Sequence, residues 1–155
     1  MTKKILYFDM DNVLVNFQSG IDQLSPEIQQ EYEDRLDEVP GIFALMQPID
    51  GAVDAFQTLA QHFDCYILST APWNNPTAWQ DKIEWVHKHF GVDDKTPAYK
   101  RLILSHHKNL NAGDFLVDDR LKNGADKFVG EHIHFGQPQF PNWEIVSAYL
   151  LARVD

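Results

Sequence analysis

The sequence predicts an α/β fold with a doubly wound, mostly parallel sheet, and two observations support that prediction. Short apolar runs alternate along the chain with amphipathic segments of helical length, as in folds built from strand–helix–strand units. The apolar runs are continuous, which is typical of strands buried on both faces of a parallel sheet. At 155 residues, 44% of them hydrophobic, the chain has the size and apolar content of one domain. We therefore expect a single domain over residues 1–155.

Apolar runs mark the expected strands. Four of them cover residues 5–8, 65–68, 102–104 and 115–117. A fifth strand is expected at either 128–129 or 133–135. Three of the strands end directly in polar residues, and functional groups of parallel sheets gather beyond the carboxyl ends of the strands. We therefore expect the functional site at that end of the sheet.

Helical periodicity marks the segments between the strands. Apolar residues recur at helical spacing over residues 51–63 and 77–90, and residues 143–152 are expected to close the chain as a helix. Residues 16–46 are strongly acidic with sparse apolar positions, although residues 26–38 favour a helix that starts at a proline. This segment is expected to be a small helical insertion after the first strand and not part of the core.

Charge and cysteine content exclude several classes of function. Thirteen Lys and Arg against 23 Asp and Glu give a formal net charge of −10, so no stable nucleic-acid complex is expected. The only cysteine, Cys65, cannot form an internal disulfide, and a zinc site built on thiolates is excluded. The apolar run at residues 5–8 is too short for a signal peptide or a membrane span. These observations favour a reduced, cytoplasmic location without membrane contact.

Two pairs of acids follow expected strands. Asp9 and Asp11 come after the first strand, and a sharp turn would let both carboxylates reach one small volume. Asp118 and Asp119 follow the fourth, where adjacent carboxylates repel each other and lose solvation. A bound hard cation such as Mg²⁺ would remove that cost. Taken singly, each pair could equally be a turn former or a solvated loop pair.

Hydroxyl groups and a lysine complete the set of candidate residues. Ser69 and Thr70 follow the second expected strand, where hydroxyls and amides can donate to a phosphoryl oxygen. Lys108 follows the third and could neutralise a phosphoryl group. Considered alone, the hydroxyls are more often caps or turn formers, and a lone lysine is usually solvated.

The order and spacing of these signals resemble the haloacid dehalogenase superfamily of aspartyl phosphotransferases, whose pattern is D-x-D-x-[TV], then Ser or Thr, then Lys, then paired acids. Within it, several stretches most resemble the 5′(3′)-deoxyribonucleotidase family. These are DMDNVLVNF (Asp9 to Phe17), PGIFALMQPIDGA (Pro40 to Ala52), YILSTAP (Tyr66 to Pro72), KIEWVHKHFG (Lys82 to Gly91) and LVDDR (Leu116 to Arg120). The resemblance covers most of the chain and implies a Rossmann-like fold with a helical cap after the first strand.

The resemblance implies catalytic and metal-binding roles for the four acids. Asp9 would be the nucleophile that forms an aspartyl-phosphate, and Asp11 the general acid and base. Magnesium would be held by Asp9, by the backbone carbonyl of Asp11 and by Asp119, with Asp118 in support.

The resemblance also implies substrate-binding residues. Ser69, Thr70 and Lys108 would bind the phosphoryl group. Lys82 matches a position near the substrate phosphate, although an exposed helix lysine is an equal alternative. Phe43 would lie at the nucleobase pocket, and Trp73 could stack on a base or sugar, with packing as the alternative role for both.

Two departures from the family pattern affect the expected cap and specificity. Asn12 stands where the family usually has glycine, and the segment before Pro40 is shorter than usual, so the cap should be reduced. A more open site could be covered by a second copy of the chain, which makes a homodimer plausible.

The resulting hypothesis is a magnesium-dependent phosphomonoesterase acting on nucleoside monophosphates, with deoxyribonucleotides as one group of candidates. Three alternatives stay open at this stage. The substrate could be another small phosphomonoester or a nucleic-acid 3′-phosphate end, or the chain could be a binding protein of the same fold without turnover.

Overall fold

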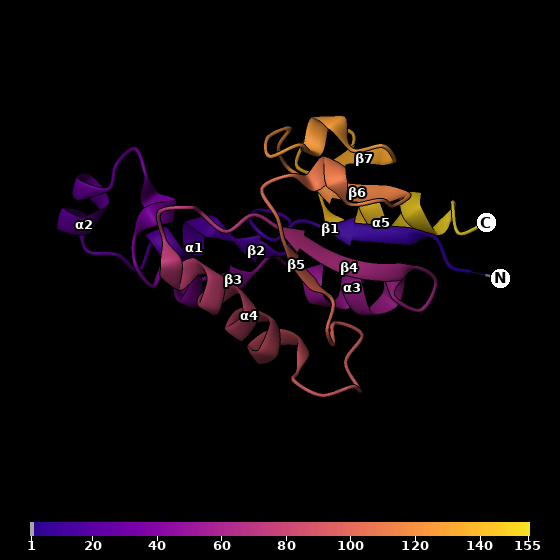
Figure 1. Ribbon diagram of the computed structural model, residues 1–155, viewed down its shortest axis with the longest axis horizontal. Coiled ribbons are helices and arrows are strands. Elements are labelled where there is room, and N and C mark those ends of the chain that lie inside the picture. The colour runs from indigo at the N-terminus through magenta and orange to yellow at the C-terminus, as the bar shows by residue number, and fades with distance from the viewer. Residues whose placement is uncertain (1) are drawn as a thin grey trace.

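The computed structural model describes residues 2–155 and contains a five-stranded sheet in which all neighbouring strands run parallel. The strands are β1 (Ile5–Phe8), β4 (Asp64–Ser69), β5 (Leu102–Leu104), β6 (Phe115–Asp118) and β7 (Glu131–His134). Their order is β5-β4-β1-β6-β7 (Figure 1). The predicted parallel α/β fold is confirmed. The ambiguous fifth strand covers residues 131–134, so the alternative at 128–129 is wrong.

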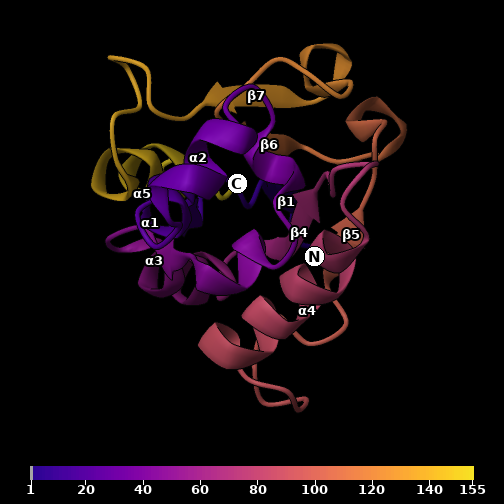
Figure 2. The ribbon, with the colours of Figure 1, turned by 90° about the vertical axis from the view of Figure 1, so that its left-hand side faces the viewer.

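The main core lies between one face of this sheet and three helices, α3 (Ala52–Leu59), α4 (Pro76–Phe90) and α5 (Trp143–Leu151). Ile42 and Met46 of the insertion are buried members of the same core, so the expectation that residues 16–46 lie outside it is wrong. Aromatic rings connect the layers: the Phe56 ring centroid lies 4.7 Å from that of Phe8 and 5.0 Å from that of Phe90. Figure 2 shows α3 and α5 together beside the sheet. No helix within residues 2–155 is both long enough and apolar enough to cross a membrane.

The opposite face of the sheet carries a smaller apolar cluster. Its buried members are Tyr7, Leu68, Leu116, Ala125 and Phe128. Two of these, Ala125 and Phe128, come from a short 3-10 helix and its end rather than from an α-helix. The helices of this chain therefore cover the two faces unequally.

Residues 16–46 emerge beyond the carboxyl ends of the strands (Figure 1). A two-residue strand β2 (Val15–Asn16) pairs antiparallel with β3 (Gln47–Pro48) and closes the base of this segment. Between them lie α1 (Phe17–Ile21), α2 (Pro26–Glu31) and the 3-10 helices η1 (Leu36–Glu38) and η2 (Ile42–Leu45).

Two expected helices end earlier than predicted. The helix expected over residues 26–38 stops at Glu31, because α2 has no buried residue and so no packing face to extend it. The helix expected over residues 51–63 stops at Leu59, because the chain must turn before β4 begins at Asp64. Phe63 is nevertheless buried, because it packs into the core from the turn between α3 and β4.

The strand order places a topological switch point at the centre of the sheet. After β1 the chain adds β4 and β5 on one side, and it then returns to add β6 and β7 on the other. A crevice beyond the carboxyl ends of β1 and β6 follows from this reversal, and ligands of open α/β sheets bind in such crevices.

Two indole groups anchor the segments that lie over this crevice. Trp143 Nε1, in α5, donates to the backbone carbonyl of Val13 at 2.7 Å, just after the first acid pair. Trp85 Nε1, in α4, donates to the carbonyl of Met46 at 3.0 Å, near the end of the insertion. Both bonds are buried, so they fix the loop and the insertion to the core.

We expect Trp143→Phe to lower the free energy of unfolding by about 2 kcal/mol, because the Val13 carbonyl would stay buried without its donor. Urea unfolding followed by circular dichroism measures this. Trp79→Phe is the matched control, since the Trp79 side chain is 37% exposed and donates no hydrogen bond within residues 2–155. Equal losses in the two variants would contradict the anchoring role of Trp143.

Candidate active site

Three carboxylates meet beyond the carboxyl ends of β1 and β6. One oxygen from each of Asp9, Asp118 and Asp119 lies within 4.8 Å of the other two. Asp9 directly follows β1 and Asp118 ends β6, so the parallel pairing of these strands brings together residues that are far apart in the sequence. Asp9 and Asp118 are only 6% and 2% exposed, so their charges have little solvent to stabilise them.

Lys108 provides the positive charge in this cluster. Its Nζ donates to Asp9 Oδ1 at 2.9 Å and to Asp118 Oδ2 at 2.6 Å. Burial lowers the pKa of Lys108, but the two carboxylates outweigh it, so the pKa is raised and the lysine stays charged. The lysine begins the short helix η3 (Lys108–Leu110), and its backbone N–H donates to the carbonyl of Asn123 at 2.7 Å.

Asp119 is the acid in the cluster that forms no ion pair within residues 2–155. Asp118 accepts from Lys108 and from the backbone N–H of Arg120, whereas Asp119 Oδ1 is buried without a hydrogen-bond partner in residues 2–155. Burial first, and then the nearby charge of Asp9, raises the pKa of Asp119 to about 8. A buried carboxylate oxygen without a donor, beside a second carboxylate, fits the coordination of a hard cation.

Asp9 itself is held between opposing effects. Burial raises the pKa of its carboxyl, and the neighbouring Asp118 adds to that rise, while Lys108 opposes both. Burial is the largest of these effects, so the pKa of Asp9 is raised overall. The ion pair with Lys108 limits that rise and favours the ionised form, which a nucleophilic carboxylate requires.

Asp11 is paired with the buried lysine of α4. Lys82 Nζ donates to Asp11 Oδ1 at 3.0 Å and lies 4.3 Å from the centroid of the Phe43 ring. Lys82 is fully buried, which excludes the alternative of an exposed helix lysine. Burial raises the pKa of Asp11, and Lys82 opposes that rise. A carboxyl group with a raised pKa that also faces a cavity is suited to giving and taking a proton.

The two hydroxyl residues differ in their bonding. Ser69 is fully buried, and its Oγ has no hydrogen-bond partner within residues 2–155. Thr70 Oγ1 donates to the carbonyl of Ser105 at 2.7 Å, so its proton is already used. Thr70 lines a small cleft together with Asp9, Lys108 and Asp118.

A larger cavity of about 530 Å³ adjoins this cleft. The two share Asp11, Thr70, Arg120 and Asn123, so the cavity opens directly onto the acid cluster. Trp73 stands at the cavity and is 79% exposed, with its ring centroid 5.8 Å from that of His106.

Phe43 does not line this cavity. It is buried behind Phe17, which does line it, and the two ring centroids lie 5.8 Å apart in an edge arrangement. The structure therefore brings together the candidate acids, both lysines and Thr70, and it places Trp73 at the cavity and Phe43 one layer beneath it. Ser69 ends β4 directly before Thr70 and lines neither the cleft nor the cavity.

Arg120 and Asn123 line both the cleft and the cavity, and neither was among the site residues expected from the sequence. Arg120 directly follows the tandem acids and Asn123 lies in the same loop, which was the available signal, since a loop that follows Asp119 must begin beside it. His106, next but one to Lys108, also lines the cavity.

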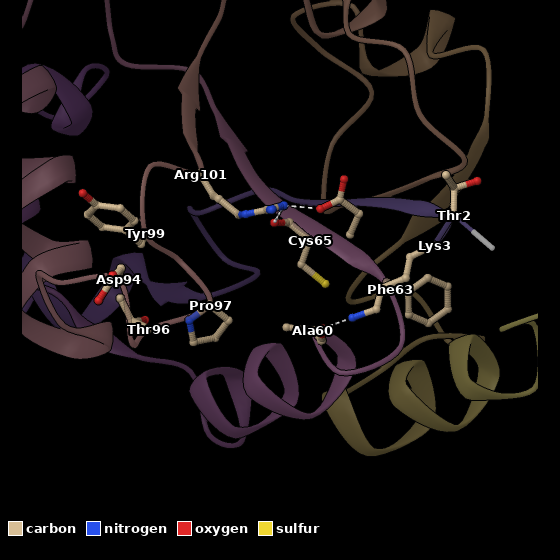
Figure 3. A pocket seen from close by; sticks show the side chains of 11 residues that line it. Thr2, Lys3, Ala60, Phe63, Cys65, Asp94, Thr96, Pro97, Tyr99 and Arg101 are labelled. Carbon is tan, nitrogen blue, oxygen red and sulfur yellow. Dashed lines mark hydrogen bonds and ion pairs between the residues drawn. The ribbon is translucent and has the colours of Figure 1, made fainter.

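A second cavity, of about 520 Å³, lies around residues that precede or begin the strands, at the opposite end of the sheet (Figure 3). Arg101 pairs there with Asp64, and burial raises the pKa of the Cys65 thiol to about 12. A thiol with such a pKa is protonated at neutral pH and is no nucleophile. The chemistry-bearing groups therefore gather in the first cavity and its cleft.

Comparison with known proteins assigns the chain to a family. Residues 19–145 match the family described as 5′ nucleotidase, deoxy (pyrimidine), cytosolic type C protein. The chain belongs to this family. The resemblance to the 5′(3′)-deoxyribonucleotidases, and with it to the haloacid dehalogenase superfamily of phosphoric monoester hydrolases, is thereby confirmed.

Individual relatives agree with this assignment. A putative 5′(3′)-deoxyribonucleotidase of Vibrio phage KVP40 is 62% identical over 151 residues, covering 97% of this chain and 86% of the relative. One of Staphylococcus aureus strain Mu50 is 26% identical over 185 residues, covering 100% and 99%. Among solved structures, a haloacid dehalogenase-like hydrolase of Xanthomonas campestris superposes with a TM-score of 0.55 at 10% identity, covering 97% of this chain and 96% of that chain, and supports the fold.

The raised pKa of Asp119 predicts pH-dependent stabilisation by a divalent cation. Without a cation, the folded-state pKa near 8 exceeds the unfolded value near 3.8, so the unbound protein loses stability as pH rises through that interval. A cation binds the ionised carboxylate, so cation binding offsets this loss of stability at higher pH. We expect magnesium chloride to raise the melting temperature more at about pH 8 than at about pH 5.

Differential scanning fluorimetry measures this shift, with EDTA as the unbound reference. Asp119→Asn is the matched variant, because a carboxamide is uncharged and does not titrate between pH 5 and pH 8, and its shift should be small at both pH values. A shift that is equal at both pH values in the wild-type chain would contradict the assignment of Asp119.

Proposed function

We propose that this chain is a magnesium-dependent phosphomonoesterase that dephosphorylates nucleoside monophosphates, deoxyribonucleotides among them, through an aspartyl-phosphate on Asp9. The observation that carries the proposal is the buried lysine bridge between Asp9 and Asp118, beside the unpaired oxygen of Asp119. This arrangement gives one carboxylate a partner that favours its ionised form and leaves another free for a cation, at the mouth of a cavity large enough for an organic leaving group.

Asp9, Asp119 and the backbone carbonyl of Asp11 would hold the magnesium ion, with Asp118 in support through its bond to Lys108. When bound, the ion would neutralise charge on the phosphoryl oxygens. Phosphoryl transfer is catalysed mainly by such charge neutralisation and by positioning of the reacting groups. The unpaired, buried Asp119 oxygen supports this set of ligands.

The chemical steps use two carboxylates in different roles. An Asp9 oxygen attacks phosphorus and the bond from phosphorus to the leaving oxygen breaks, while Asp11 donates its proton to that oxygen. Asp11 then takes a proton from a water molecule that attacks phosphorus. The bond between phosphorus and Asp9 breaks, inorganic phosphate leaves, and both carboxyl groups return to their starting states.

The remaining candidate residues hold the phosphoryl group and the acid in place. The unpaired Ser69 hydroxyl and the Lys108 ammonium are suited to bind phosphoryl oxygens, with Thr70 at the rim of the cleft. Lys82 bonds Asp11, so its main role in this proposal is to position the acid and maintain its charge balance between the two half-reactions.

The substrate class is supported by the relatives, which are named as deoxyribonucleotidases, and by the walls of the cavity. Phe17 and Trp73 offer aromatic surface there, and Phe43 would act by supporting Phe17 from beneath. Residues 16–46, which contribute Phe17 and an acidic loop to the cavity, would be the reduced cap of this enzyme.

We expect Asp9→Asn to lower kcat by about a thousandfold or more, because an amide oxygen is a poor nucleophile and no phospho-enzyme forms. Phosphate release from thymidine 5′-monophosphate and from para-nitrophenyl phosphate, with magnesium present, measures this. Asp94→Asn, at an exposed position on the distal cavity, is the matched control. Turnover by Asp9→Asn close to that of the wild-type chain would refute the nucleophile.

The same assay, extended to ribose 5-phosphate and to a 3′-phosphorylated oligonucleotide, tests the substrate class. The proposal expects kcat/KM to be highest for nucleoside monophosphates. Equal values for the sugar phosphate and the nucleotides would reduce the proposal to a general phosphomonoesterase.

A further inference from the structure

Left-handed backbone conformations at non-glycine residues are concentrated beside the candidate active site. Within residues 2–155 they occur at Asn12, Lys100 and Asn123, with φ angles of 62°, 56° and 55°. Both asparagines line the 530 Å³ cavity, whereas Lys100 precedes β5 and lies outside it. Residues held in such conformations cluster at functional sites, so the side chains of both asparagines are candidates for ligand binding.

The fold explains the backbone of Asn12 but not its side chain. The Asn12 N–H donates to the carbonyl of Val15 at 2.7 Å, which closes the tight loop after Asp11 and requires the positive φ. Glycine would adopt this conformation without steric cost, since it has no Cβ. The carboxamide of Asn12 is therefore not needed to build the loop.

That carboxamide is free to bind a ligand. The Asn12 side chain is exposed, lines the cavity and makes no hydrogen bond within residues 2–155. A carboxamide offers two donors and an acceptor, so it can either donate a hydrogen bond to a hydroxyl group or accept one from it. Asn12 directly follows Asp11, the proposed proton donor to the leaving oxygen. Its side chain is thus suited to meet the part of the leaving group closest to that oxygen.

The charge of the cavity restricts what that part can be. Glu33, Asp34 and Asp37, from the loop around η1, line the cavity and are exposed, and none forms an ion pair within residues 2–155. Arg120 is the one lysine or arginine among the lining residues. This excess of negative charge disfavours a leaving group with a second phosphate and favours neutral hydroxyl groups.

We propose that Asn12 is a specificity-determining residue whose carboxamide hydrogen-bonds a sugar hydroxyl of an uncharged nucleoside leaving group. The inference rests on the proposed function and names the part of its substrate that this residue binds. Because a hydroxyl away from the reacting bonds is bound equally in the ground and transition states, loss of the contact should act mainly on KM.

Asn12→Gly tests the proposal, because glycine keeps the positive φ and removes only the carboxamide. The two nucleotides to compare are thymidine 5′-monophosphate and its 3′-deoxy analogue, which differ by one hydroxyl group. We expect the wild-type chain to prefer thymidine 5′-monophosphate by about fivefold or more in kcat/KM, the effect of one hydrogen bond. In Asn12→Gly that preference should fall below about twofold. The loss should appear mainly as a higher KM for thymidine 5′-monophosphate.

Lys100→Gly is the matched control, since it also places glycine at a positive φ but lies away from the cavity, and its preference should equal that of the wild-type chain. Melting temperatures show that all three proteins fold. A preference that is the same in Asn12→Gly as in the wild-type chain, or no preference in the wild-type chain, overturns the inference.

Para-nitrophenyl phosphate, whose leaving group has no sugar, separates this failure from that of the proposed function. If Asn12→Gly lowers kcat/KM equally for this ester and for both nucleotides, the role of Asn12 is in loop structure and the inference is overturned while the phosphatase remains. If the wild-type chain releases phosphate from none of the three, the proposed function itself fails.

Discussion

The arrangement of this site depends on how buried negative charge is balanced. Asp9 and Asp118 are nearly inaccessible to solvent, and neither could remain ionised there without a compensating charge. Lys108 donates to both, so one buried ammonium serves two carboxylates. Asp119 adds a third acid that this lysine does not neutralise, so with all three acids ionised the cluster is two positive charges short. A divalent cation would supply what is missing, and that need links the electrostatics of the fold to the proposed chemistry.

The fold makes this balance possible by bringing together residues from distant parts of the chain. Parallel pairing of β1 with β6 places the first and second acid pairs side by side, and the loop after β5 supplies the lysine between them. The Trp85 indole holds the insertion over residues 16–46 to α4, and the Trp143 indole holds the loop after Asp11 to α5. The Asp11–Lys82 pair joins that loop to α4. The acid and its partner lysine are therefore positioned by packed elements rather than by free loops, which favours a preorganised site.

Much of the fold could be predicted from the sequence because the buried strands are continuous apolar runs. The four strands at residues 5–8, 64–69, 102–104 and 115–118 were predicted to within a residue at each end, since nothing else in a short chain competes for such runs. The helix expected over residues 26–38 was wrong in its extent, because local propensity favours it but no core face supports it beyond Glu31. The fifth strand was ambiguous because its run is interrupted by polar residues.

The sequence could predict which residues form the site, but not which of them contact one another. The acids and hydroxyls could be selected because they follow strand ends, where a parallel sheet gathers side chains. Sequence could not show that Lys82 is buried against Asp11, because a lysine in a helix is normally solvated. It could not separate Phe17 from Phe43, since which ring faces a cavity is decided by three-dimensional packing. The positive φ of Asn12 was equally hidden, because asparagine adopts several backbone conformations.

The most direct test of the account is a crystal structure of the chain grown with magnesium and beryllium fluoride, which mimics a phosphoryl group on a carboxylate. We expect beryllium bonded to an Asp9 oxygen, with Lys108 beside it and the cation between Asp9 and Asp119. A beryllium fluoride group bonded to another residue, or a cation site away from Asp119, would contradict it.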